Sequence, residues 1–564
     1  MSNGLLRKRI VTALGAALYA LFAAFGFQAQ GHGPVDIPHA LLVAAALFIP
    51  AYALLALLLR KSSRTASADA KPFHAGKAFL FIFACYVPVF LVAYPGSFAY
   101  DVPFQLRQVF TGEYSTHHPL LHTLLMGGCV KLGQAVGSIN LGAALYTVIQ
   151  MAALAGCFAA ACASIARSCS KKAARRSAAF FALYPLHMFM AVNATKDVLF
   201  SGLFALTLAL AFEMIKAPSA AAAADLQLRL RRFTCLYPPQ AAAGSTSPEG
   251  DALRKNGSNL PLQGEGDRVS GGKGFALILC GAGMMLLRNN ALYAVIVWLP
   301  LLCFLKKRGI ALIACMLAAV VGFTAANGAM KTTTGAVDGD LVEMLSIPVQ
   351  QLARARNVAG KRLTDEEREA IDRIMPQNSW QLYDATISDP VKFEFDTAEF
   401  KRDTGKYTGV YLSVGKKCMD VYTDALLAHT VAFWYPYREY KVSGYYLQMG
   451  VNAEQTESWC DFDWISQTSP LRRVLESLSW RFGAQGAMQY PVIGYLFNMG
   501  AIIWVMFFFV LREMHAGRWG RFAVCLLPVL LWGTFLLGPV MAGRYVYPFV
   551  CSLPVLASRP RGGA

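Results

Sequence analysis

Long apolar runs recur along the chain, and short polar or basic stretches separate them. Most of the runs approach the roughly 20 residues that a helix needs to cross a hydrocarbon core of about 30 Å. No small-residue cleavage site follows the first run clearly, so we interpret that run as a retained helix rather than a signal peptide. We expect about twelve membrane-spanning helices, near residues 10–27, 37–59, 79–94, 141–166, 178–192, 198–212, 275–287, 291–305, 310–329, 491–511, 522–537 and 546–557.

Two stretches interrupt this pattern. Residues 217–273 are rich in Ala, Gly, Ser, Pro and Arg and have no apolar periodicity, which predicts a disordered insertion. Residues 330–489 are polar but contain aromatic side chains throughout, and Thr364 to Glu367 form a capping-box sequence that predicts a helix to about Ile374. We therefore expect a folded, mainly helical segment between the late spans.

The predicted fold class is an all-α polytopic membrane protein. Its expected divisions are two N-terminal helices (1–77), a membrane module with two polar loops (78–216), the insertion (217–273), further spans (274–329), the polar segment (330–489) and the C-terminal spans (490–564).

Composition agrees with a membrane protein. Hydrophobic residues make up 55% of the chain and charged residues 15%, whereas soluble proteins carry about 25% charged residues. Most of the 13 cysteines lie in apolar runs, where they serve as small hydrophobic residues. Cys418 and Cys460 both lie in the polar segment, where pairing in an oxidising compartment is one of two open alternatives.

The net charge of +18 reflects orientation in the membrane rather than nucleic-acid binding. Residues 330–489 hold 18 Lys and Arg and 22 Asp and Glu, whereas the rest of the chain holds 34 basic and only 12 acidic residues. The basic excess lies in short connectors between spans, as the positive-inside rule describes. We expect a membrane protein with both termini in the cytoplasm, residues 330–489 outside, and no nucleic-acid partner.

This topology leaves four of the scarce carboxylates on the outer side, namely Asp36, Asp101, Glu113 and Asp197. Asp36 lies in a plain loop, whereas the others lie where helices meet the outer interface. A first cluster contains Asp101 and Glu113 together with polar side chains that can bind substrate, which are Tyr100, Gln105, Tyr114, His117 and His118. Such a set can hold a proton acceptor and bind a cation or a phosphate, although solvated loop residues explain it too.

Further basic residues lie at the same interface. Lys196 and Asp197 occupy one outer turn, Arg288 and Asn289 another, and Arg544 and Tyr545 a third. Arginine and lysine here can grip a phosphate, and Asp197 can ligate a divalent ion. Each of them can equally mark the membrane interface.

The order of these motifs resembles the GT-C superfamily of membrane glycosyltransferases, in particular an uncharacterised bacterial branch. The resemblance covers residues 78–557 without the insertion. It rests on short sequences in the same order: Tyr100-Asp101, Gly112-Glu113-Tyr114, His117-His118-Pro119-Leu120, Lys196-Asp197 with Leu199-Phe200-Ser201, Arg288-Asn289-Asn290, Ser346-Ile347-Pro348-Val349-Gln350-Gln351, and Arg544-Tyr545 with Pro548.

The resemblance implies transfer of a sugar from a polyprenyl-phosphate donor to a glycan, lipid or protein acceptor on the outer face. It makes Asp101 the catalytic base, with Glu113 as a second candidate, and Asp197 an aid to metal or donor binding. Lys196, Arg288 and Arg544 become candidates for holding the lipid phosphate. It also implies a bacterial cytoplasmic membrane, and it allows a divalent cation (Mg or Mn) near Asp101 and Asp197, with no organic cofactor. For Gln350 and Gln351 two alternatives stay open, since they can approach the acceptor or belong to the start of a structural helix.

Two other functions stay open. A transporter or lipid-linked sugar flippase predicts charged residues near the bilayer midplane or broken helices in paired halves. A structural or assembly protein would use residues 330–489 as its binding module. The sequence concentrates its polar groups at one interface, which favours the enzyme.

Overall fold

The computed structural model describes residues 3–29, 35–62, 72–98, 101–215, 265–305, 307–436 and 492–560. Helices dominate this part of the chain, and its only β-pairing consists of isolated bridges. Tyr100, Cys460, residues 217–264 of the insertion and residues 437–489 of the polar segment lie outside the described residues.

Within the described residues, six helices are long and apolar enough to cross a membrane, which confirms a multi-pass, all-α membrane protein. They are α1 (Asn3–Ala29), α2 (Ile37–Ser62), α3 (Ala75–Ala93), α6 (Ile139–Ser168), α9 (Lys196–Met214) and α13 (Lys307–Thr334). Shorter helices complete the bundle: α7 (Lys171–Leu183), α8 (Pro185–Ala191), α11 (Glu265–Leu287), α12 (Asn289–Leu302), α22 (Ile493–Phe497), α23 (Met499–His515), α24 (Trp519–Phe535) and α25 (Tyr547–Ala557).

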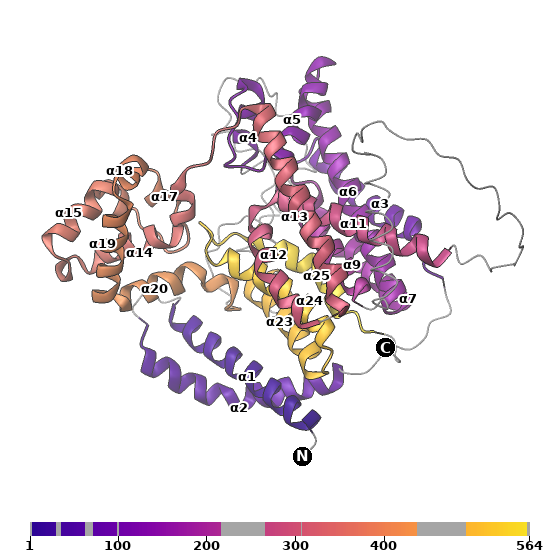
Figure 1. The fold of residues 1–564 in the computed structure, drawn as a ribbon, viewed down its shortest axis with the longest axis horizontal. Coiled ribbons are helices and arrows are strands. Elements are labelled where there is room, and N and C mark those ends of the chain that lie inside the picture. The colour runs from indigo at the N-terminus through magenta and orange to yellow at the C-terminus, as the bar shows by residue number, and fades with distance from the viewer. Residues whose placement is uncertain are drawn as a thin grey trace, which may run out of the picture.

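Helix α9 is the centre of this bundle. Of the 18 consecutive residues that make up its most apolar stretch, 78% are buried inside the protein, whereas the corresponding share in α2 is 6%. Helix α2 packs mainly on α1 at the edge of the protein (Figure 1). Helices α6, α11 and α25 surround α9. Because α9 begins at Lys196, two charged residues of the predicted cluster lie at the end of the most enclosed helix.

The structure differs from the predicted spans at four places. The expected span at 491–511 is two helices, since α22 ends at Phe497 and α23 begins at Met499. Helices α4 (Val102–Thr111) and α5 (Leu120–Ala135) follow the third span, where no helical span was expected. The expected span at 178–192 is two helices, α7 and α8, which separate at Tyr184 because Pro185 cannot continue the hydrogen bonds of α7. Helix α11 begins at Glu265, inside the range predicted as disordered.

The polar segment is represented by residues 335–436, which we call the inserted segment. It contains η2 (Leu341–Leu345), α14 (Ser346–Val358), η3 (Gly360–Arg362), α15 (Asp365–Ile374), α16 (Gln377–Trp380), α17 (Asp389–Lys392), α18 (Thr397–Arg402), α19 (Thr404–Lys417), α20 (Met419–Thr430) and η4 (Val431–Phe433). The predicted capping box is confirmed, since Thr364 and Glu367 exchange hydrogen bonds at the start of α15.

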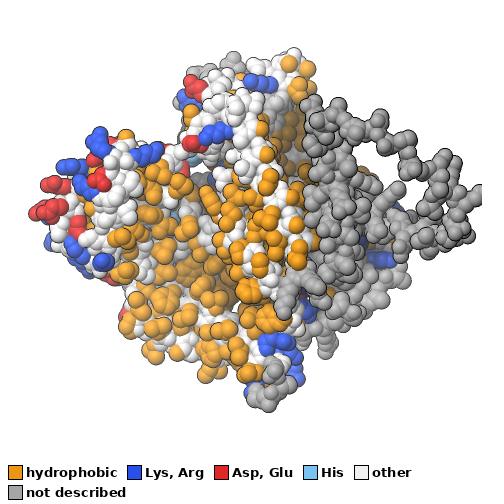
Figure 2. Space-filling model, viewed as in Figure 1, with side chains coloured by type: hydrophobic (Ala, Val, Ile, Leu, Met, Phe, Trp, Pro, Cys, Tyr) orange, Lys and Arg blue, Asp and Glu red, His pale blue; other side chains and the backbone are white. Residues whose placement is uncertain are grey.

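The inserted segment has a hydrophobic core of its own, which includes the fully buried Ile371, Met375 and Val391. It forms a lobe beside the bundle, on the left of the view (Figure 1). Acidic and basic side chains gather on this lobe, whereas apolar side chains cover the visible face of the helices beside it (Figure 2). The two surfaces fit one part in water and one part in lipid.

Candidate functional site

Two loops that are distant in sequence are joined directly beneath the candidate site. We call residues 94–101 the first loop and residues 192–197 the second loop. Ser97 donates its backbone N–H to the carbonyl of Val192 at 2.9 Å and accepts from the N–H of Ala194 at 2.8 Å. This short parallel bridge places the end of the first loop, which carries Asp101, beside the start of α9.

Asp101 immediately precedes α4, yet its side chain does not cap that helix. Its carboxylate faces the second loop instead, and Nζ of Lys196 lies 2.6 Å from Oδ2 of Asp101. Nη2 of Arg544, from the turn before α25, lies 3.4 Å from Oδ1 of Asp101. Three predicted residues from three separate parts of the chain therefore meet.

Two arginine side chains contact the carboxylate of Asp197. Nε of Arg288 donates a short hydrogen bond to Oδ1 of Asp197, and Nε of Arg544 lies 3.6 Å from Oδ2. The Arg288 guanidinium also lies over the ring of Tyr545, 4.4 Å from its centroid, and over that of Phe535 at 5.0 Å. Arg544 thus joins the two acidic residues, while Arg288 is enclosed by aromatic rings.

The two aspartates differ in access to solvent. The Asp101 side chain is 23% exposed and Lys196 is 13% exposed, whereas Asp197 is 1% exposed. Asp101 and Lys196 are therefore the members of the cluster that a substrate can reach first. Asp197 is enclosed and orients the arginines.

The electrostatics of the cluster keep Asp101 ionised. Burial would raise its pKa, but the positive charges of Arg544 and Lys196 outweigh burial and hold the pKa well below its usual range. His118 lies beside the pair, with Nδ1 3.4 Å from Nζ of Lys196 and 3.9 Å from Oδ2 of Asp101. Burial and the charge of Lys196 lower the pKa of His118 well below 6.5, so that this imidazole is neutral at pH 7.

Other predicted residues of this region lie outside the cluster. Glu113 and His117 are exposed, Tyr114 is half-buried, and Asn289 is exposed at the start of α12. Within the described residues Glu113 forms no ion pair. Gln105 is buried and binds the side chains of Thr123 and His122, so its amide is occupied inside the protein.

Gln350 and Gln351 also bind within the protein. Nε2 of Gln350 donates to the carbonyls of Asp384 and Ile387, and Nε2 of Gln351 donates to the carbonyl of Tyr422. Both side chains belong to α14, near its start, and hold other parts of the inserted segment. The structure gives them a structural contact and does not bring them to the Asp101 cluster.

The donor set fits an anion better than a divalent cation. Among the described residues, no three His, Cys, Asp or Glu side chains gather as metal ligands do. Asp101 and Asp197, the expected ligands, each face two basic side chains, and the cluster of Lys196, Arg288 and Arg544 exceeds their negative charge. An added divalent cation would be repelled by this excess. We therefore derive no chemical step from a metal.

Two features of the site were missed by the sequence analysis. The Thr195 hydroxyl accepts from the backbone N–H of Asp197 and caps α9, a role that its place before the apolar run could have indicated. His122, Tyr146 and Gln150 form a buried polar path behind the loops. Polar side chains inside apolar runs were its signal, because such groups need partners.

Comparisons with known proteins give one relationship. No curated protein matches the chain, and no solved structure matches it. One family model matches residues 111–559, which contain Lys196, Asp197, Arg288 and Arg544 but begin after Asp101. Because the match covers most of the sequence, the chain belongs to DUF6020, a family of unknown function.

Proposed function

We propose that this protein is a membrane glycosyltransferase of the GT-C type, which transfers a sugar from a polyprenyl-phosphate donor to an acceptor on the outer face of a bacterial cytoplasmic membrane. The observation that supports this proposal is the cluster of Lys196, Arg288 and Arg544 around Asp101 and Asp197. An excess of basic groups around a reachable carboxylate suits the binding of a phosphate beside a base.

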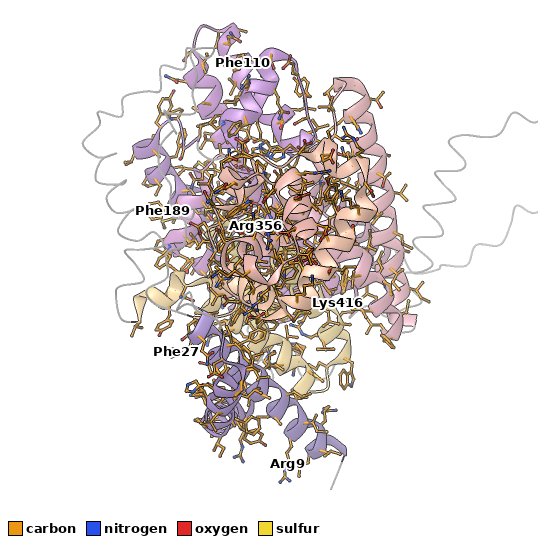
Figure 3. The ribbon with its side chains drawn as sticks, turned by 90° about the vertical axis from the view of Figure 1, so that its left-hand side faces the viewer. Arg9, Phe27, Phe110, Phe189, Arg356 and Lys416 are labelled. Carbon is orange, nitrogen blue, oxygen red and sulfur yellow. The ribbon has the colours of Figure 1, made fainter. Side chains whose placement is uncertain are left out.

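The proposed topology has twelve spans and both termini in the cytoplasm. The N-terminal basic residue Arg9 and Phe110 of α4 lie at opposite ends of the protein in Figure 3. Arg9 follows Arg7 and Lys8 in the sequence, and such clusters stay on the cytoplasmic side. The Asp101 cluster, next to α4 in sequence, then faces the outer side, where lipid-linked donors present their sugars to outer acceptors.

In the proposed reaction, Lys196 and Arg544 bind the donor phosphate. As these cations turn toward the phosphate, Asp101 loses part of the positive field that lowers its pKa, and it becomes a stronger base. Asp101 then takes the proton of an acceptor hydroxyl, whose oxygen forms a bond to the anomeric carbon. The bond from that carbon to the phosphate oxygen breaks, and the lipid phosphate leaves with the electron pair, so that the configuration is inverted.

The distribution of charge along α9 favours this enzyme over a transporter. Lys196 and Asp197 begin the helix and Glu213 lies at its other end, where it binds Arg167 and Lys273. The residues between these ends carry no charge. A transport path through the centre of the bundle typically requires ionisable groups near the midplane.

The test compares Asp101→Asn and Glu113→Gln with the wild type in membrane extracts. Each extract is supplied with radiolabelled polyprenyl-phosphate sugars, and the transfer rate is measured. We expect Asp101→Asn to lower the rate by roughly 100-fold or more, the range for loss of a general base. Glu113→Gln should stay within about three-fold, since Glu113 lies outside the cluster, where loss of one solvated charge has little effect.

Equal amounts of each variant in the membrane fraction provide the control for insertion. Full activity of Asp101→Asn would remove Asp101 from catalysis. If Glu113→Gln alone lost activity, the base would be Glu113. Absence of transfer by the wild type from every donor would overturn the proposal and favour a transporter.

A further inference from the structure

A continuous buried polar path runs behind the charged cluster. Nδ1 of His122 lies 3.0 Å from the side-chain amide of Gln105, and its Nε2 lies 2.7 Å from the hydroxyl of Tyr146. That hydroxyl donates to Oε1 of Gln150 at 2.9 Å. All four side chains are fully or almost fully buried. The path crosses α4, α5 and α6, so it links three helices without reaching solvent.

The two ends of the path hold the two loops that carry the cluster. Gln105 lies in the first turn of α4, and its backbone N–H donates to the carbonyl of Asp101 at 3.1 Å. At the other end, Nε2 of Gln150 donates to the carbonyls of Ala191 at 3.0 Å and Asn193 at 2.7 Å. These carbonyls lie just before Lys196. The path therefore connects the residues on either side of the 2.6 Å contact between Asp101 and Lys196.

The hydroxyl of Tyr146 joins the two halves of this path. Nδ1 of His122 lies against Oε1 of Gln105, which can only accept, so Nδ1 carries a hydrogen and donates it to that oxygen. Burial lowers the pKa of His122 to about 3, so this imidazole is neutral and its Nε2 is an acceptor. The hydrogen of the Tyr146 hydroxyl therefore lies between two acceptors, Nε2 of His122 at 2.7 Å and Oε1 of Gln150 at 2.9 Å.

Helix α6 supports the first loop as well. The hydroxyl of Thr147, next to Tyr146, donates to the carbonyl of Pro95 at 2.7 Å. Gly96 follows, with φ +128°, and a Cβ at this position would lie 2.4 Å from the Thr147 hydroxyl oxygen. One turn of α6 therefore contacts both loops, and the position of each loop is set against the same helix.

We propose that Tyr146 is a positioning residue, whose hydroxyl keeps the loops of Asp101 and Lys196 in register without touching substrate. The effect on catalysis rests on the proposed function, whereas the effect on loop register does not. Reactions that need two groups placed together lose rate when one of them shifts by about 1 Å, by up to roughly 100-fold.

Tyr146→Phe removes the hydroxyl and keeps the ring, which packs edge-to-face with Phe98 and His122. Tyr86→Phe is the matched control. The Tyr86 side chain is also fully buried, and its hydroxyl donates to the carbonyl of Phe181 at 2.9 Å, on α7. Both changes remove one buried hydroxyl, but only Tyr146 lies on the path between the loops.

The experiment measures hydrogen exchange in the full-length protein in detergent, together with sugar transfer in membranes. We expect Tyr146→Phe to speed exchange of the Ser97 and Ala194 amides, which bridge the loops, by about ten-fold or more, and to lower kcat more than it raises KM. Tyr86→Phe should lower the melting temperature by about as much as Tyr146→Phe does, because each change removes one buried hydroxyl. It should leave the exchange rates of the Ser97 and Ala194 amides and the rate of sugar transfer within about two-fold of the wild type.

Each result has one meaning. Unchanged exchange at Ser97 and Ala194 in Tyr146→Phe would overturn the positioning role. Equal acceleration in both variants would show a general loss of stability and would overturn it too. If exchange is faster in Tyr146→Phe alone but the wild type transfers no sugar, Tyr146 holds the two loops in register and the proposed function is wrong.

Discussion

Arg544 is the side chain on which the candidate site depends most. It reaches both Asp101 and Asp197, at 3.4 Å and 3.6 Å, and comes from the last turn before α25. Asp197 is almost fully enclosed, so removing it would leave two arginines without their common carboxylate. Asp101 stays reachable. The two aspartates therefore have different roles in one cluster: the buried Asp197 orients the arginines, and the more exposed Asp101 can meet a substrate.

The neutral state of His118 gives a pH dependence that can be measured. Its folded pKa is lowered, so below about pH 6.5 the unfolded chain binds a proton that the folded protein does not. We expect the free energy of unfolding to fall as the pH decreases from 6.5, with a contribution from His118 of at most about 1.4 kcal/mol per pH unit. His118→Gln should weaken this dependence.

Thermal unfolding in detergent between pH 8 and pH 5 measures the effect. Asp101 does not contribute to the pH dependence in this range. Its folded pKa is lowered from an ordinary value near 4, so its contribution to stability is lost only below about pH 4. His117→Gln is the control, because His117 is exposed. The same slope in the wild type and His118→Gln would show that His118 is protonated alike in both states.

At the scale of elements, the site forms where helix ends meet. Helices α4, α9 and α25 begin near the cluster, and the first and second loops approach each other through the bridge at Ser97. The turn at Gly96 makes this approach possible. Its φ of +128° favours glycine, and the Thr147 side chain fills the space where a Cβ would lie.

Gly96→Ala should therefore destabilise the protein by roughly 1–3 kcal/mol through backbone strain and the clash with Thr147. Gly112→Ala is a matched control, since Gly112 has φ +78° but no atom within 4 Å of an added Cβ. This second change should cost only the strain of about 1–2 kcal/mol. The melting temperatures of the two variants measure the difference, and a smaller loss for Gly96→Ala would contradict the importance of the contact.

At the scale of the whole molecule, the inserted segment is attached at two places beside the site. Val337 pairs with residues 114–116 of the chain after α4, and Ser388 donates to the carbonyl of Pro539 at 2.8 Å. The ring of His429 adds contacts to the carbonyls of Ala385 and Gly538. The segment thus lies against both the loop that follows α4 and the turn that precedes Arg544.

The proposed topology predicts which surfaces face the two sides of the membrane. In a cysteine-free background, Leu412→Cys on the inserted segment should react with an impermeant thiol reagent in intact cells. Lys172→Cys on α7 should react only after the membrane is permeabilised. Both positions are exposed in the structure, so access alone does not separate them. Labelling of Lys172→Cys in intact cells would reverse the proposed orientation.

The local part of this protein was predictable from its sequence. Apolar runs at 141–166 and 198–212 correspond to α6 (Ile139–Ser168) and α9 (Lys196–Met214). The capping box at Thr364 was also confirmed. Hydropathy and helix caps depend on neighbouring residues, which explains this success. The prediction failed where a short helix such as α5 has mixed polarity, and where Pro185 divides one apolar run into two helices.

The candidate site required the tertiary structure. The sequence alone identified Asp101, Lys196, Asp197, Arg288 and Arg544 as scarce charged residues at one interface. It did not determine which of them meet, because Lys196 is 95 residues from Asp101 and Arg544 is 443 residues away. Gln105, Gln350 and Gln351 had the same polar character, yet packing turned their amides toward internal partners. Composition determines which groups need a partner, and only folding brings a particular partner within reach.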